Sequence, residues 1–266
     1  MVRRTAHKSR PSKMGRKWTQ DDIIAYNITV VYQDLMTFFG MTNLPSPDVN
    51  KAALTAQDFQ DPATANDEET LRMLYSMDRM TDPDNLYRAP ATICFVDNLF
   101  NVLHYGTMEQ SRFSMFPVSG PQLCYIANQG RPPQMDICIM NRSDVISLVV
   151  KVNRHSRGFD PEPRLISDAI GAFHNDNLMR VTRLGTNPLT SMVMPGIVMD
   201  GSMPTFYKIP ITAELVEAVE AGKQPEEETV VHAYRPEVPR PEEGMKPLDN
   251  RYIILSCFEA FRQFVF

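Results

Sequence analysis

Two apolar runs near the middle of the chain constrain the fold more than any other feature. Residues 135–140 are almost continuously apolar, and residues 145–153 are nearly so. Strands without alternating polar residues are usually buried on both faces. Helices must then cover the sheet, so we expect an α/β protein with a mixed sheet flanked by helices.

The spacing of apolar residues elsewhere predicts the elements around these two strands. We expect a first helix from Thr19 to Gly40, a second one opened by Asn66 and Glu69, and others over 91–104, 161–176, 213–221 and 248–266. Further strands are expected over 122–128, 194–199, 205–211 and 229–234, and a loop over 41–66. Thr19, Asp160 and Thr212 are of the types that cap helix N-termini, and Gly40 and Gly222 stand where helices end.

These elements suggest four parts. Residues 1–17 form a basic, flexible arm, and 18–90 form a helical N-terminal extension that includes Trp18 as a core residue. Residues 91–222 form the α/β core. Residues 223–266 are a Pro- and Glu-rich segment, a strand and a last helix packed on that core, with the acidic run 226–228 facing solvent.

Charge is distributed unevenly along the chain. Residues 1–17 contain seven basic residues and no acid, which leaves 20 of the 27 basic residues and all 32 acidic ones to the rest, a net charge of −12. Such an arm can act as a nuclear import signal, bind nucleic acid, or fold back on acidic surface. A mitochondrial presequence is less favoured, because residues 11–17 show no amphipathic stripe. The arm residues expected to contact nucleic acid are Arg3, Arg4, Lys8, Arg10, Lys13, Arg16 and Lys17.

Several classes of protein are not supported by the sequence. No run of about 18 apolar residues predicts a membrane helix, and the N-terminus does not resemble a secretory signal. The four cysteines form no CxxC pair, and phosphate-loop, dinucleotide, zinc-protease and hydrolase-elbow motifs are all missing. We therefore expect an intracellular protein, nuclear or cytoplasmic, with no bound organic cofactor and no membrane partner.

One pair of residues, Asp136 and Lys151, is of the types that serve in metal-dependent phosphate chemistry. Asp136 opens the strand 135–140 shortly after Pro133, and Lys151 lies near the end of the next strand. A carboxylate there could hold Mg²⁺ against a phosphate, while the lysine steadies an attacking water or a developing charge. The ordinary alternatives are that Asp136 caps a turn or pairs with an arginine, and that Lys151 extends to solvent.

With its order of helix, three strands, helix and strand, residues 91–210 resemble the core of the PD-(D/E)XK nuclease-like superfamily. In that family the second strand begins with an aspartate, often after a proline, and the third carries an acid, one spacer and a lysine. The resemblance implies a restriction-endonuclease-like core with extra N- and C-terminal helices. It also implies that Asp136 and Lys151 are catalytic, that Asp136 is a metal ligand, and that an active enzyme would use Mg²⁺ or Mn²⁺.

The motif departs from the family at its second acid. Val149 stands two residues before Lys151, on the same face of the strand, and valine cannot bind a hard cation. Asp144 is the first candidate for a displaced acid, and Asp97 and Glu109 are others.

The chain as a whole is also similar to uncharacterised proteins from mushroom-forming fungi. The similarity is carried by residues 204–210 (PTFYKIP) and 244–251 (GMKPLDNR). It implies no function.

Three hypotheses therefore stay open, and the sequence does not decide whether the chain is an enzyme. The first is a nuclease-like domain that has lost catalysis and keeps a nucleic-acid-related or binding role. The second is an active Mg²⁺-dependent nuclease with a displaced second carboxylate. The third is a protein–protein interaction module unrelated to nucleases, which would bind a partner or a second copy through its C-terminal helix. It requires the following side chains to be exposed: Phe258, Phe261, Phe264 and Phe266.

Overall fold

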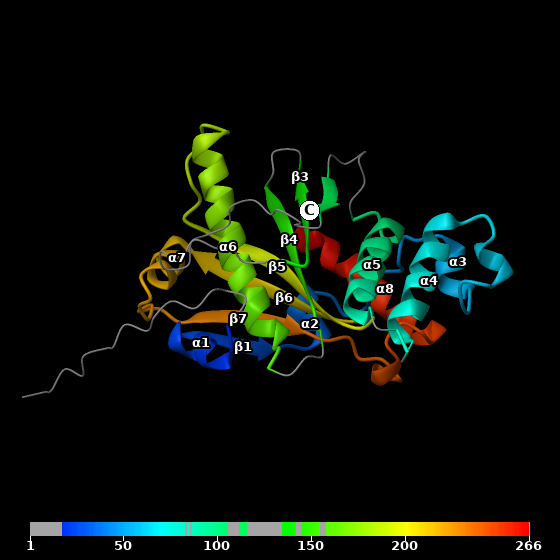
Figure 1. The fold of residues 1–266 in the computed structure, drawn as a ribbon. Helices are drawn as coiled ribbons and strands as arrows, with labels where there is room; N and C mark the ends of the chain where they lie inside the picture. The colour runs from blue at the N-terminus through cyan, green and yellow to red at the C-terminus, as the bar shows by residue number, and fades with distance from the viewer. Residues whose placement is uncertain are drawn as a thin grey trace, which may run out of the picture.

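A computed structural model describes residues 18–82, 84–85, 87–105, 112–115, 135–141, 145–154 and 158–265, with only the backbone described for 88–89 and 112–115. It is a mixed α/β structure, as predicted, built on one seven-stranded sheet with helices on both faces (Figure 1). The strands are β1 (Ile28–Tyr32), β2 (Arg112–Met115), β3 (Ile137–Asn141), β4 (Ile146–Val152), β5 (Ser191–Asp200), β6 (Met203–Thr212) and β7 (Thr229–Tyr234). The helices are α1 (Gln20–Ala25), α2 (Leu35–Phe39), α3 (Lys51–Thr55), α4 (Glu68–Thr81), α5 (Arg88–Val102), α6 (Pro161–Thr182), α7 (Ala213–Glu220) and α8 (Leu248–Val265).

The sheet order is β1-β7-β6-β5-β4-β3-β2. Two neighbouring pairs are parallel, β1 with β7 and β4 with β5, and the other pairs are antiparallel. The parallel pair β4 and β5 is connected by α6, because parallel neighbours need a crossover between them.

Helices cover the two faces of the sheet in separate apolar clusters. The residues of β4 divide between them: Leu148 and Val150 join the cluster formed with α2, α4, α5 and α8, whereas Val149 joins the cluster formed with α1, α6 and α7. Ile146 also lies in the second cluster, because the register of β4 shifts between Ile146 and Leu148. Burial on both faces explains why β4 is almost entirely apolar. Trp18 is buried in the second cluster, as predicted.

The long N-terminal helix predicted from Thr19 to Gly40 is wrong in its middle. Its ends are correct, because Thr19 and Asp22 form a capping box and Gly40 ends α2 with a positive φ of 74°. Between them, residues 28–32 form β1, which pairs with β7 at the edge of the sheet. The β-branched run in this segment favours a strand, and β7, which comes late in the chain, offers it hydrogen bonds.

Most later elements lie where the apolar spacing predicts them. Asp160 and Thr212 cap α6 and α7 through their side chains, and β7 has the predicted bounds. The expected loop over 41–66 contains two short helical segments, α3 and a 3-10 turn at Pro62–Thr64. The predicted strand over 122–128 lies outside the described residues, whereas β2 was not predicted.

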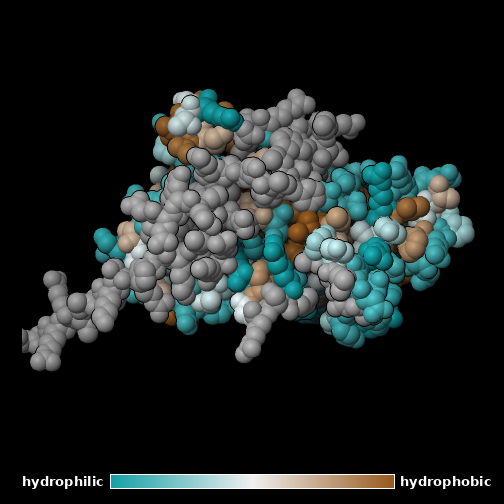
Figure 2. Space-filling view, viewed as in Figure 1, coloured by the Kyte–Doolittle hydropathy of each residue, from teal (hydrophilic) through white to brown (hydrophobic). Residues whose placement is uncertain are grey.

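The C-terminal helix α8 uses its apolar face inside the molecule. Phe258 and Phe261 are fully buried and Phe264 packs against the same core, while Phe266 lies outside the described residues. The condition for docking through this helix is therefore not met by Phe258 or Phe261. Exposed apolar side chains occur instead near the C-terminal end of α6, where Figure 2 shows a brown area (Leu178, Val181 and Leu184).

The segment 244–251 joins α8 to the rest of the structure. The buried Arg251 guanidinium donates hydrogen bonds to the carbonyls of Ala53 and Ala56 at α3 and of Met245. Burial lowers the pKa of Arg251 to about 10. Gly244 has a φ of +55°, and a Cβ at this position would lie 2.2 Å from the hydroxyl oxygen of Ser202.

Within the described ranges, no helix is long and apolar enough to cross a membrane.

Candidate functional site

The start of β3 and the end of β4 lie side by side and bring Asp136 close to Lys151. The two strands are antiparallel, and Ile137 pairs with Val150. The backbone N–H of Asp136 donates to the carbonyl of Val150 across this pair, at 3.3 Å. The sequence therefore placed Asp136 and Lys151 correctly on neighbouring strands, and the register of the hairpin determines how they meet.

A third residue, Asp168, comes from α6 and completes what we call the Asp136–Lys151–Asp168 cluster. The Lys151 ammonium lies 2.9 Å from Asp168 Oδ2 and 3.9 Å from Asp136 Oδ2. The three residues are only 6, 3 and 1 % exposed, in the order Asp136, Lys151, Asp168. Lys151 thus turns inward toward α6, the side that Val149 also faces, and does not extend to solvent.

Both oxygens of Asp136 have partners within the protein. Oδ1 accepts from the Arg154 guanidinium at 2.5 Å, and Oδ2 accepts from the backbone N–H of Val152 at 2.9 Å. The pairing with an arginine is the ordinary structural role considered for this residue. Arg154 is itself half-exposed, so this bond lies at the boundary between the cluster and solvent.

Asp168 is held differently. Burial raises the pKa of its carboxyl, while the charge and hydrogen bond of Lys151 act in the opposite direction. Only Oδ2 is bonded; Oδ1 is buried and has no hydrogen-bond partner in the described part of the chain. An unsatisfied buried oxygen costs about 1–3 kcal/mol and calls for an explanation, such as an ion, a water or a catalytic role.

Sequence reasoning missed Asp168, although a signal was present. It lies within the predicted helix 161–176, among the residues of its apolar stripe, which are Leu165, Ile166, Ala169, Ile170 and Phe173. An acid inside such a stripe must be buried, and a buried acid needs a partner.

The other candidate residues do not join the cluster in the described structure. Asp97 lies on α5, which packs on the opposite face of the sheet. Asp144, Glu109 and the basic arm lie outside the described residues.

Two side chains of the cluster, Asp136 and Asp168, are of the chemical type that binds a magnesium ion, and the Lys151 ammonium lies next to both of them. Carboxylate oxygens are the ligands that Mg²⁺ prefers, and one or two of them commonly suffice because water and a substrate phosphate complete the shell. Asp168 Oδ1 is available for this role, whereas Asp136 would first have to release Arg154. Among the described residues, no group of three or more His, Cys, Asp or Glu side chains could hold a metal ion.

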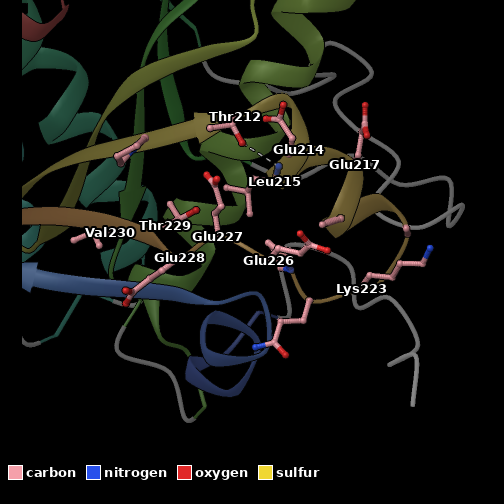
Figure 3. A pocket seen from close by; sticks show the side chains of 15 residues that line it. Thr212, Glu214, Leu215, Glu217, Lys223, Glu226, Glu227, Glu228, Thr229 and Val230 are labelled. Carbon is pink, nitrogen blue, oxygen red and sulfur yellow. Dashed lines mark hydrogen bonds between the residues drawn. The ribbon is translucent and has the colours of Figure 1, made fainter. Parts of the chain in front are cut away.

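A separate cavity of about 750 Å³ lies between α7 and the segment that leads into β7 (Figure 3). Glutamates dominate its polar lining (Glu214, Glu217, Glu226, Glu227 and Glu228). Lys223 is the one basic residue among the described residues that line it. The last three of these glutamates are exposed, as predicted. An acidic lining repels phosphate, and no residue of the cluster lines this cavity, so phosphate chemistry does not belong here.

Comparison of the chain with protein-family models and with curated protein sequences gives no match. The function of the Asp136–Lys151–Asp168 cluster must therefore be argued from its geometry and chemistry.

Proposed function

We propose that the chain is a nuclease-like protein that hydrolyses phosphodiester bonds with Mg²⁺ or Mn²⁺, with its second acid on α6 in place of strand β4. One observation carries the proposal: Asp136 and Asp168 both lie within 4 Å of the same Lys151 ammonium. Asp168 would supply the carboxylate that Val149 cannot. The order α5, β3, β4, α6, β5 is also compatible with the helix, strands, helix and strand that the nuclease resemblance implies, although the first of its three expected strands (122–128) lies outside the described residues.

Each residue of the cluster has a role in this proposal. Asp136 and Asp168 would hold the divalent ion, which would neutralise charge on the phosphate when bound. Lys151 would orient the attacking water or stabilise the developing charge, since its ammonium is held next to both carboxylates. The basic arm would add sequence-independent, salt-sensitive contacts to the nucleic acid.

A second candidate is a nuclease-like domain that binds nucleic acid without cleaving it. The observation in its favour is that both oxygens of Asp136 are already bonded, to Arg154 and to the Val152 amide. In that case the cluster is a buried ionic network that joins β3, β4 and α6.

A cleavage assay distinguishes the two candidates. The purified protein and the variants Asp136→Asn and Asp168→Asn would be incubated with labelled single- and double-stranded DNA and RNA, in Mg²⁺ and in Mn²⁺. Asp176→Asn is a matched control, because Asp176 is another buried acid of α6 and is not part of the cluster.

Cleavage that both cluster variants abolish and the control retains would support the enzyme. No cleavage by the wild type, or equal cleavage by all variants from a contaminant, would refute it and leave the binding role.

A further inference from the structure

Two arginines lie beside the Asp136–Lys151–Asp168 cluster and contact the same aromatic ring. Arg154 follows β4, and Arg164 lies in the first turn of α6. Their guanidinium carbons are 5.8 Å and 4.1 Å, respectively, from the centre of the Phe159 ring. Cation–π contacts of this kind hold the flat guanidinium groups in place.

The positive charge of Arg164 is partly buried and has few compensating partners. No carboxylate of the described residues lies within 4 Å of it, and its Nε is buried without a hydrogen-bond partner. Its hydrogen bond to the carbonyl of Gly158 is long, at 3.4 Å. Burial and then the positive charge of Arg154 lower the pKa of Arg164, while Asp160, Asp168 and Asp136 act in the opposite direction. Two cations placed together in this way favour an anionic ligand.

We propose that Arg154 and Arg164 bind a backbone phosphate of a single nucleic-acid strand next to the cluster. The choice of a nucleic acid rests on the proposed function, whereas the phosphate follows from the arginines, whose forked donors match phosphate oxygens. Phe159 is a positioning residue, because it fixes both guanidinium groups. Arg154 also has a second role: on turning to the phosphate it releases Oδ1 of Asp136, so strand binding frees a metal ligand.

The test is strand binding without cleavage. Fluorescence anisotropy with a short labelled single-stranded DNA in EDTA would be measured for the full chain over a range of salt concentrations. Arg164→Met keeps the apolar stem and removes the charge, and Arg164→Lys keeps the charge and removes the fork. Arg72→Met on α4 is the matched control, since Arg72 is an exposed arginine paired with Glu68.

Arg164→Met is expected to weaken binding about tenfold or more, and to reduce the salt dependence by about one phosphate contact. Arg164→Lys should fall between it and the wild type, and Arg72→Met should bind as the wild type does. The arm contributes equally in all four proteins. Circular dichroism would establish that each variant is folded.

The result separates this site from the proposed catalysis. Binding that depends on Arg164, in a protein that does not cleave, would support the arginine site and refute the nuclease. Cleavage together with binding that Arg164→Met leaves unchanged would overturn the arginine site alone. A wild type that does not bind the strand in EDTA would overturn it as well.

Discussion

Replacing Lys151 by methionine tests how strongly the cluster depends on its single central cation. The change keeps an apolar chain of similar length and removes the ammonium that lies 2.9 Å from Asp168. Asp168 is 1 % exposed, so its carboxylate would remain in the interior without its cation. Breaking a buried ion pair from one side costs about 3–5 kcal/mol.

That loss should lower the melting temperature by about 6–20 °C, and it should depend on pH. Burial raises the pKa of Asp168, and Lys151 opposes the rise. Without Lys151 the folded-state pKa increases further above the unfolded value. The variant therefore loses least stability in acid, where Asp168 is protonated in both states, and loses more as the pH rises toward neutral.

Urea unfolding at acid and at neutral pH measures both effects, with the fluorescence of Trp18, the only tryptophan, as the reporter. The double variant Lys151→Met, Asp168→Asn should recover part of the loss, because it removes the unpaired charge as well. A destabilisation below about 0.5 kcal/mol, or one that is the same at both pH values, would refute the reasoning.

Three further predictions concern stability, and urea unfolding measures each. Arg251→Met should destabilise the protein by about 3–5 kcal/mol, because it leaves several buried carbonyls without their donor; Arg72→Met is the control. Gly244→Ala should be destabilising by more than about 1 kcal/mol, because of its positive φ and the clash with Ser202; an unchanged midpoint would contradict this. Burial raises the pKa of Asp176 to about 7. The contribution of Asp176 to the free energy of unfolding therefore falls as the pH rises from the pKa of the unfolded state to about 7. Asp176→Asn should accordingly gain stability relative to the wild type between acid and neutral pH; a stability difference that stays constant with pH would contradict this.

Local signals in the sequence determined most of the helices and strands. The apolar stripes of α6 and α8, the caps at Asp160 and Thr212, and the left-handed glycine at Gly40 act over a few residues. Such features can be recognised from spacing and residue type, because the groups that stabilise them are close in the chain. The apolar run of β4 likewise indicated a buried sheet before any contact was known.

The tertiary structure decided what depends on residues far apart in the sequence. Residues 28–32 fit a helical spacing, and only pairing with β7, which begins at Thr229, makes them a strand. The Lys151 ammonium lies 2.9 Å from Asp168, a residue 17 positions later in the chain, because the crossover helix α6 brings this acid over β4. Residue types can indicate that a buried charge needs a partner, but sheet register and helix packing decide which one it meets.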